Sequence, residues 1–383
     1  MIIFRRAHSR APGRLAAPIA VTPMTVCATD NLLPCAPQDQ PLVIAHRGAS
    51  GYVPEHTLAA YALAIEMGAD FVEPDLVMTK DGVLVARHEN EIGGTTDVAE
   101  WPEFAERRTT KVIDGQPIGG WFTEDFTLVE LKRLRARERI PDLRPENRRF
   151  DGIFAIPTLG EVLDLVRGAN FRFQLEAVAA GKSERRCVGV YPETKHPSYF
   201  RSIGLPMECP LLRLLDHGEY FQPSGKVFIQ SFEVGNLKRL RTMTSFPLIQ
   251  LLNDSGAPWD FVVAGDERSY ADLAKPEGLA RIARYANGIG VSKNLVFPRT
   301  GVAGGLGAPT TLIADAHAAG LVVHGWTFRA ENYFLPPKFR SSGGEVKYGD
   351  LIAEITIFLE QGMDGFFTDQ ADVGVRARDS VGR

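Results

Sequence analysis

The segment Asp70-Phe71-Val72-Glu73-Pro74-Asp75-Leu76 places two carboxylates one residue apart in an apolar run. Alternate residues of a β-strand point to the same face, so Glu73 and Asp75 are expected to project together. Two buried carboxylates repel each other and are costly to desolvate unless a cation neutralises them. Oxygen ligands of this kind suit Mg²⁺, Ca²⁺ or Mn²⁺ rather than zinc. The pattern predicts a divalent-metal site, and the alternative is a solvated loop with incidental acids.

Two histidines follow other strand-like runs. His46 and Arg47 come directly after the run 42–45, and His88 follows the run 83–86. An arginine can bind a phosphate through paired donors, and a histidine can transfer a proton near neutral pH. Two histidines beside a metal-bound phosphate would form a general acid–base pair. Taken singly, each of these residues is also consistent with a structural histidine or a surface arginine.

Strand-like runs alternate with helical patterns over most of the chain from residue 41. The runs lie at 42–45, 71–76, 83–86, 188–191, 227–230, 248–252, 288–291, 321–327 and 365–368. Helical patterns are predicted at 57–67, 232–241, 268–286, 309–319 and 348–361. The repeated β-then-α order predicts a parallel sheet covered by helices, and eight strands fit a (β/α)₈ TIM barrel. An open doubly wound sheet is the competing architecture, but no G-x-G-x-x-G follows the first strand.

One segment interrupts this rhythm. Residues 90–157 contain clustered charges and several Gly and Pro residues. Because the segment begins where strand ends carry the candidate catalytic residues, we predict a small insertion subdomain that caps the site. A solvated excursion of the chain is the alternative.

The N-terminal residues have the order of a secretory signal. The first 29 residues contain four arginines and no acidic residue, and the uncharged stretch 15–28 ends in Val26-Cys27-Ala28. A basic region, an apolar stretch and small residues at a cleavage point define such a signal. An organelle-targeting peptide and a disordered leader are alternatives. We predict a leader and linker over residues 1–40, with a signal peptide to about residue 28.

Composition excludes several classes of protein. The chain of 383 residues has a net charge of −4, so it has no general attraction for nucleic acid or anionic membrane. No uncharged apolar run reaches the roughly 20 residues of a membrane-spanning helix. The four cysteines include no Cys-x-x-Cys pair, which argues against a disulfide scaffold or a structural zinc site. After cleavage at residue 28 three cysteines would remain, of which Cys187 and Cys209 could pair.

Several motifs in order carry a family resemblance. They are His46-Arg47-Gly48-Ala49 through Pro54-Glu55-His56-Thr57, Glu73-Pro74-Asp75 through Lys80-Asp81-Gly82, Val85-Ala86-Arg87-His88, Tyr191-Pro192-Glu193-Thr194-Lys195, Gln230-Ser231-Phe232 and Asp364-Gly365-Phe366-Phe367-Thr368-Asp369. With these motifs the chain resembles the glycerophosphodiester phosphodiesterase family, and most of all its periplasmic bacterial branch. The likeness extends through most of residues 41–372.

The resemblance implies roles for individual residues. His46 and His88 would be the acid–base pair, Glu73, Asp75 and Glu193 would hold one divalent cation (Ca²⁺ first, Mg²⁺ second), and Arg47 and Lys195 would bind the phosphate. Glu55 would support the first loop or contact the metal, and His56 would orient that loop. Phe232 and Trp326 would line the alcohol side of the pocket, and ordinary barrel core is the alternative for both.

The implied reaction is hydrolysis of a glycerophosphodiester, such as glycerophosphocholine or glycerophosphoethanolamine, to sn-glycerol 3-phosphate and an alcohol. A lysophospholipase D-like phosphodiesterase of the same fold and a non-catalytic phosphodiester-binding protein are the alternatives. The barrel is predicted over residues 41–375, with a C-terminal tail at 376–383. We expect a periplasmic or secreted protein, with a cytoplasmic one as the alternative. The head-group preference, the metal, the route of attack and the oligomeric state stay open.

Overall fold

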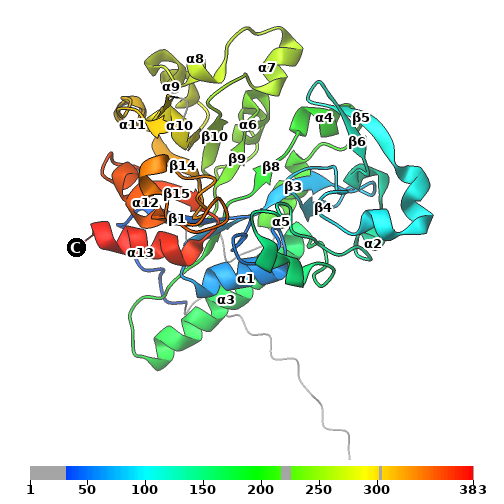
Figure 1. Cartoon of the computed structure of the whole chain (residues 1–383), viewed down its shortest axis with the longest axis horizontal. Helices are drawn as coiled ribbons and strands as arrows, with labels where there is room; N and C mark the ends of the chain where they lie inside the picture. The colour runs from blue at the N-terminus through cyan, green and yellow to red at the C-terminus, as the bar shows by residue number, and fades with distance from the viewer. Residues whose placement is uncertain (1–31, 217–225, 302–303, 383) are drawn as a thin grey trace, which may run out of the picture. The chain divides into compact units, whose positions relative to one another are not determined.

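The computed structural model describes residues 32–216, 226–301 and 304–382, and residues 33–383 belong to one compact unit (Figure 1). The predicted signal peptide and the first part of the predicted linker lie outside the described residues.

Eight strand positions form a closed parallel barrel. They are β1 (Leu42–His46), β2 with β3 (Phe71–Glu73 and Asp75–Met78), β7 with β8 (Gly189–Val190 and Glu193–Thr194), β9 (Ile229–Ser231), β10 (Leu248–Leu252), β11 (Gly288–Ser292), β14 (Val322–Phe328) and β15 (Gly365–Thr368). Each pairs in parallel with the next, and β15 returns to β1. Pro74 interrupts the second position because it has no N–H for the ladder. The predicted (β/α)₈ TIM barrel is confirmed.

Helices follow the strands around the outside of the barrel (Figure 1). They are α1 (Leu58–Glu66), α3 (Leu159–Ala179), α4 (Pro197–Ser202), α5 (Glu208–Asp216), α6 (Val234–Arg241), α7 (Trp259–Ala264), α8 (Tyr270–Leu273), α9 (Pro276–Ile282), α10 (Lys293–Val296), α11 (Leu312–Ala318), α12 (Leu351–Leu359) and α13 (Ala371–Val381). The helix predicted over 268–286 is two helices, because Pro276 starts α9 at its first position. The longest of these helices, α3, was not predicted from the sequence.

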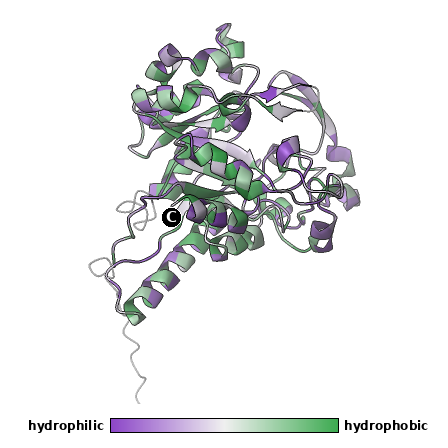
Figure 2. Cartoon of the chain, turned by 60° about the vertical axis from the view of Figure 1, so that its left-hand side comes forward, coloured by the Kyte–Doolittle hydropathy of each residue, from purple (hydrophilic) through white to green (hydrophobic). Residues whose placement is uncertain are grey.

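Apolar side chains fill the barrel and the layer between strands and helices. Figure 2 shows that the central strands and the helices around them are rich in hydrophobic residues. All five residues of β10 and of β11 are buried, as expected for parallel strands covered on both faces. The polar strand-end residues therefore stand out against an apolar scaffold.

The insertion follows β4 (Leu84–Ala86), which pairs antiparallel with β3. It contains short 3₁₀ turns, the helix α2 (Leu128–Leu131) and the hairpin of β5 (Thr109–Ile113) and β6 (Gln116–Gly120). We predicted that it caps the site. Arg144 of the insertion contacts Asp369, just beyond β15. None of the described residues of the insertion lines the cavity of about 440 Å³ at the carboxyl ends of the strands.

A disulfide attaches the N-terminal end of the described chain to the segment before β7. Cys35, inside the predicted linker, forms a disulfide with Cys187, while Cys209 is free and exposed. The suggested pairing of Cys187 with Cys209 is therefore wrong. The predicted boundary at residue 375 falls inside α13. Among the described residues, no helix is long and apolar enough to cross a membrane.

Candidate active site

The candidate residues meet because they occupy neighbouring positions on neighbouring strands. His46 at the end of β1 is the register partner of Glu73 on β2. Asp75 on β3 is the partner of Glu193 on β8, which in turn faces Gln230 on β9. The carboxyl ends of the strands in a (β/α)₈ barrel line the active site. One row of the barrel mouth thus carries a histidine, three carboxylates and an amide.

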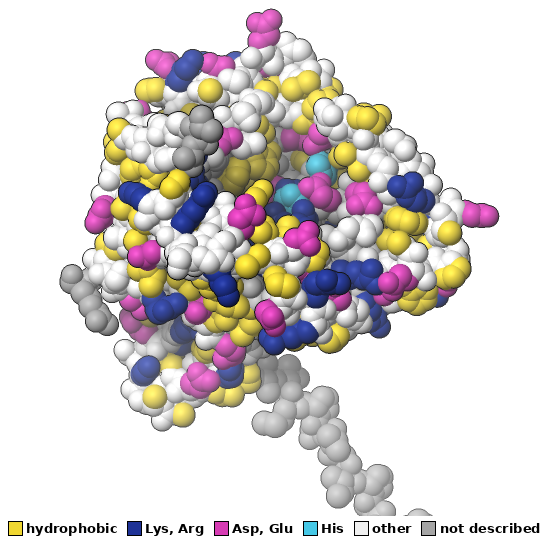
Figure 3. Space-filling view, viewed as in Figure 1, with side chains coloured by type: hydrophobic (Ala, Val, Ile, Leu, Met, Phe, Trp, Pro, Cys, Tyr) yellow, Lys and Arg dark blue, Asp and Glu magenta, His cyan; other side chains and the backbone are white. Residues whose placement is uncertain are grey.

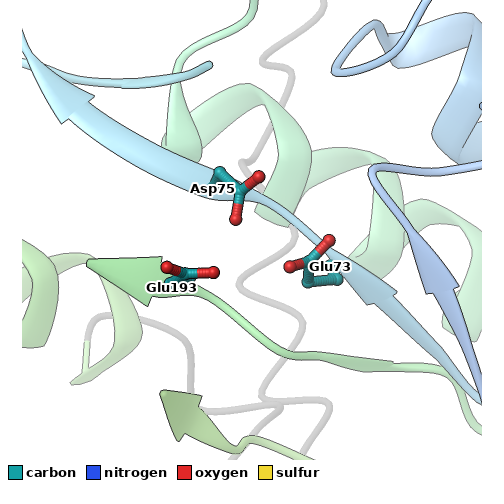
Figure 4. Close-up of side chains that lie close together, drawn as sticks. All are labelled: Glu73, Asp75 and Glu193. Atoms are coloured by element: carbon teal, nitrogen blue, oxygen red, sulfur yellow. The ribbon is translucent and has the colours of Figure 1, made fainter. Parts of the chain in front are cut away.

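Glu73, Asp75 and Glu193 form a buried acidic triad (Figure 4). Each offers a ligand oxygen, and these three oxygens lie within 4.8 Å of one another. Burial, reinforced by Asp75 and Glu193, raises the pKa of Glu73 well above its usual range, and burial raises the pKa of Glu193 to about 8. One buried oxygen, Asp75 Oδ1, has no hydrogen-bond partner. An all-oxygen donor set with an unpartnered anionic oxygen fits a hard divalent cation.

Arg47 and Lys195 bring positive charge to the triad. The Arg47 N–H donates to Glu73 Oε2 at 2.8 Å, and its Nε lies 3.4 Å from Asp75 Oδ2. Lys195 Nζ lies 2.9 Å from Glu193 Oε1. Arg47 has φ +60°, a left-handed conformation that costs energy in a residue other than glycine. This conformation turns its backbone N–H toward the triad.

His46 is held by a carboxylate from the last strand. Its Nδ1 lies 2.6 Å from Asp369 Oδ1, just beyond β15. Asp369 Oδ2 accepts from Arg144 Nη2 at 2.5 Å and from Arg329 Nε at 2.8 Å. Although burial opposes it, these cations hold the pKa of Asp369 well below its usual range. Burial, with Arg47 next, lowers the pKa of His46 to about 4, so its ring is neutral at pH 7.

His88 reaches the triad because β4 runs back along β3. The Arg87 N–H donates to the Asp75 carbonyl at 2.9 Å, which places the next residue beside the metal ligands. His88 Nε2 lies 3.3 Å from Lys195 Nζ, and its Nδ1 lies 2.7 Å from Glu89 Oε1. Burial, followed by Arg47 and Lys195, lowers the pKa of His88 well below its usual range. Asp369 thus forms a hydrogen bond with His46 Nδ1, whereas Glu89 lies within ion-pair distance of His88 Nδ1, which has no hydrogen-bond partner among the described residues.

The acidic triad, the two histidines, Arg47 and Lys195 line a cavity of about 440 Å³. Figure 3 shows histidine and acidic side chains inside a hollow on this face of the molecule. Phe232 and Trp326 stand on one wall with ring centroids 5.8 Å apart. Polar and charged groups line the part contributed by later loops, namely Asn253, Asp254, Ser292, Lys293, Asn294, Arg299 and Arg329. The cavity is therefore lined by the acidic triad on one side and by polar and charged side chains of the later loops on the other.

The structure brings nine predicted residues together around this cavity: His46, Arg47, Glu73, Asp75, His88, Glu193, Lys195, Phe232 and Trp326. Glu55 lies beside it and lines a smaller cavity of about 230 Å³. It binds Arg47 at 2.8 Å and Arg139 of the insertion, and it is not one of the triad. His56 Nε2 lies 3.0 Å from Asp75 Oδ2, so it touches a candidate metal ligand.

Five further residues at the site received no role from the sequence: Glu89, Gln230, Asp369, Arg144 and Arg329. Gln230 Nε2 donates to Glu73 Oε1 at 3.0 Å and so fixes one candidate metal ligand. Glu89 directly follows His88, and Asp369 closes the last shared motif, so each could have been suspected. Nothing in the sequence marks Arg144, which lies in the insertion.

A closed (β/α)₈ barrel whose strand ends carry three carboxylates that could hold a divalent cation, two cations and two histidines has the groups that hydrolysis of a phosphate ester requires. The model of the glycerophosphoryl diester phosphodiesterase family matches residues 46–373. The chain belongs to this family, and it is an enzyme with glycerophosphodiester phosphodiesterase activity.

Individual relatives agree with this assignment. The chain is 34% identical to the Arabidopsis thaliana glycerophosphodiester phosphodiesterase GDPD6, over 86% of this chain and 84% of that protein. It is 28% identical to a glycerophosphodiester phosphodiesterase of Haemophilus influenzae, over 87% and 88%. The fold is similar to that of an Oleispira antarctica phosphodiesterase solved with the product sn-glycerol-3-phosphate, with a TM-score of 0.54 and 19% identity over 89% of this chain and 97% of that one.

Proposed function

We propose that this enzyme hydrolyses glycerophosphodiesters such as glycerophosphocholine and glycerophosphoethanolamine to sn-glycerol 3-phosphate and an alcohol, with one divalent cation and a His46–His88 acid–base pair. The observation that carries the proposal is the acidic triad flanked by two cations and two histidines in one cavity. The product bound to the Oleispira antarctica relative supports the glycerol 3-phosphate side of the reaction.

The metal would be held by Glu73, Asp75 and Glu193. Ca²⁺ is our first choice and Mg²⁺ the second, because carboxylate oxygens suit both ions. A bound divalent cation polarises a phosphoryl group and offsets its developing charge. The unpartnered Asp75 Oδ1 and the raised pKa values of Glu73 and Glu193 support a cation here, since the three carboxylates repel one another without one.

Arg47 and Lys195 bind the phosphate oxygens in this proposal. Their charges stabilise the additional negative charge that develops in the transition state. Asp369 holds His46 with its proton on Nδ1, so Nε2 is free to take a proton from the nucleophile. In this proposal His88 donates a proton to the leaving alcohol. The pKa of His88 lies well below its usual range, so this role requires the anionic phosphate diester and the nearby Glu89 carboxylate to stabilise the protonated ring.

The polar wall of the cavity favours a small hydrophilic alcohol. Asn253, Ser292 and Asn294 line it together with charged groups, whereas an acyl chain requires an apolar groove. The test is to compare release of sn-glycerol 3-phosphate from glycerophosphocholine with release of choline from lysophosphatidylcholine. We expect the first substrate to have the higher kcat/KM. A higher kcat/KM for lysophosphatidylcholine would instead identify a lysophospholipase D.

We also propose that the protein is exported to the periplasm or secreted. The acid-free, arginine-containing leader supports export. The disulfide between Cys35 and Cys187 agrees with an oxidising compartment. Fractionation of the producing cells, with N-terminal sequencing of the mature chain, tests this proposal. An intact leader on a cytoplasmic protein would contradict it.

A further inference from the structure

We propose that His196, held between Asp114 of the insertion and Glu89 of the barrel, is a positioning residue for His88. The tip of the β5–β6 hairpin thereby becomes part of the apparatus that orients one of the two catalytic histidines. This inference rests on the proposed role of His88 and adds residues that the proposed mechanism does not use.

A continuous chain of contacts links the hairpin to His88. Asp114 Oδ2 lies 2.7 Å from His196 Nδ1, and His196 Nε2 lies 3.0 Å from Glu89 Oε2. The other oxygen of the same carboxylate, Glu89 Oε1, lies 2.7 Å from His88 Nδ1. The Glu89 carboxylate therefore bridges two imidazole rings, one in the site and one outside it.

The hairpin is built to deliver Asp114 to this place. Ile113 pairs with Gln116, so Asp114 and Gly115 form a two-residue turn, and both have positive φ, +46° and +77°. Asp and Gly are favoured in such a turn. A Cβ on Gly115 would come within 2.6 Å of the Trp259 ring of α7, so only glycine lets the tip pack there. Contact with Trp259 fixes the tip and hence the Asp114 carboxylate.

His196 is itself held in an unusual backbone conformation. It lies in the left-handed region at φ +48°, immediately before Pro197 starts α4. Its side chain is largely buried, at 14% exposure, whereas that of Glu89 is 41% exposed. A half-exposed glutamate would sample several rotamers without a fixed partner, because ordering a glutamate side chain costs entropy. His196 supplies that partner.

Charge explains why a histidine is suited to this position. Although burial opposes protonation, the hydrogen bonds to Asp114 and Glu89 raise the pKa of His196 to about 9, so it is a cation at pH 7. The nearby Glu233 carboxylate accepts from Ser198 of α4. Asp260 Oδ2 of α7 accepts from the Gly235 N–H, and Asp260 Oδ1 has no hydrogen-bond partner among the residues that the structure describes. A cation between Asp114 and Glu89 removes their mutual repulsion and holds the Glu89 carboxylate toward His88.

The arrangement matches what Asp369 does for the other histidine. Asp369 is fixed by the buried Arg144 and the half-buried Arg329, and Glu89 is fixed by one protonated histidine that depends on the insertion. A carboxylate close to Nδ1 restricts the orientation of a histidine ring, at His46 through a hydrogen bond and at His88 through an ion-pair contact. Asp369 therefore lies beside His46 and is held by Arg144 and Arg329. Glu89 lies beside His88 and is held by His196.

The test uses two variants of the full chain, Asp114→Asn and His196→Asn. Asparagine tolerates the left-handed conformation that both positions require, so each variant removes charge while keeping the backbone. We expect each variant to lower kcat about tenfold with little change in KM. This effect is smaller than the roughly 100-fold loss that a 1 Å displacement of a catalytic group can cause, because His88 itself is retained. The pKa of His196 is measured by NMR from its ring resonance, which is assigned because it is absent from the spectrum of His196→Asn. In Asp114→Asn this pKa should fall by about 1 to 3.

Val112→Ala is the matched control, because Val112 lies on the same hairpin and is 63% exposed. It should leave kcat and the pKa of His196 unchanged. The inference is overturned if Asp114→Asn and His196→Asn both keep the wild-type kcat, or if Val112→Ala lowers kcat as much as they do. Full activity of His88→Ala would instead overturn the proposed function, so the two failures are distinguishable.

Discussion

Replacing Asp369 by asparagine probes the orientation of His46 without changing side-chain size. In the wild type one Asp369 oxygen faces His46 and the other faces Arg144 and Arg329. The asparagine oxygen would turn toward the two arginines, because its NH₂ group cannot accept their hydrogen bonds. The NH₂ group would then face His46 Nδ1 and require it to be an acceptor. The proton of the neutral ring moves to Nε2, which can no longer act as a base.

The expected loss follows from this change of tautomer. General base catalysis contributes roughly 10²- to 10⁴-fold, so kcat should fall at least about 100-fold. Breaking a buried ion pair costs roughly 3–5 kcal/mol of unfolding free energy. We expect a value near the low end, about 3 kcal/mol, because Arg144 keeps a second carboxylate, Glu331, at 2.6 Å.

The assay is the initial rate of sn-glycerol 3-phosphate release, with metal affinity measured by calorimetry and stability by urea unfolding. Metal affinity should stay close to wild type, because Asp369 is not in the acidic triad. Asp372→Asn is the matched control, since Asp372 accepts from the Tyr52 hydroxyl at 2.7 Å and lines neither cavity. If Asp369→Asn keeps kcat within about threefold of wild type, the tautomer argument is refuted.

Three further predictions concern acid–base chemistry, the disulfide and pH. His88→Ala should lose roughly 10²-fold or more in kcat while calorimetry still detects metal binding, and near-wild-type turnover would exclude its role. Cys35→Ser opens a disulfide that joins positions 152 residues apart, so urea unfolding should show a loss of up to about 5 kcal/mol, whereas Cys209→Ser should show none. The folded-state pKa of His196 is raised from 6.5 to about 9, so its contribution to stability is complete below pH 6.5 and is lost as pH rises through 9. The unfolding free energy should therefore fall less over this interval in His196→Asn, and an unchanged pH profile would contradict the assignment.

Local patterns were enough to predict the barrel and two of the three carboxylates of the acidic triad. Strand alternation placed Glu73 and Asp75 on one face, and the structure shows their ligand oxygens together with that of Glu193. Each of these residues lies at a strand end, where the direction of a side chain follows from strand geometry. The strand-end pattern also suggested that the two histidines form a pair, whereas only the family resemblance supplied Glu193.

The groups that orient the histidines depend on contacts that sequence patterns do not record. Asp369 meets His46 across 323 residues, and Arg144 meets Asp369 across 225. The disulfide joins Cys35, in a segment predicted as linker, to Cys187, so spacing among the cysteines was uninformative. The helix α3 went unrecognised although Thr158 and Glu161 form a capping box at its start.

The central claim is that a divalent cation at the acidic triad and the flanking basic groups together cleave a glycerophosphodiester. The most direct test measures sn-glycerol 3-phosphate release from glycerophosphocholine before chelation, after chelation, and after adding back Ca²⁺ or Mg²⁺ separately. We predict activity in the untreated enzyme, loss with chelator, and recovery with at least one ion, with Ca²⁺ the more effective. In Glu193→Gln, recovery should require a higher metal concentration or fail. Full activity in chelator, or no product with either ion, would contradict the account.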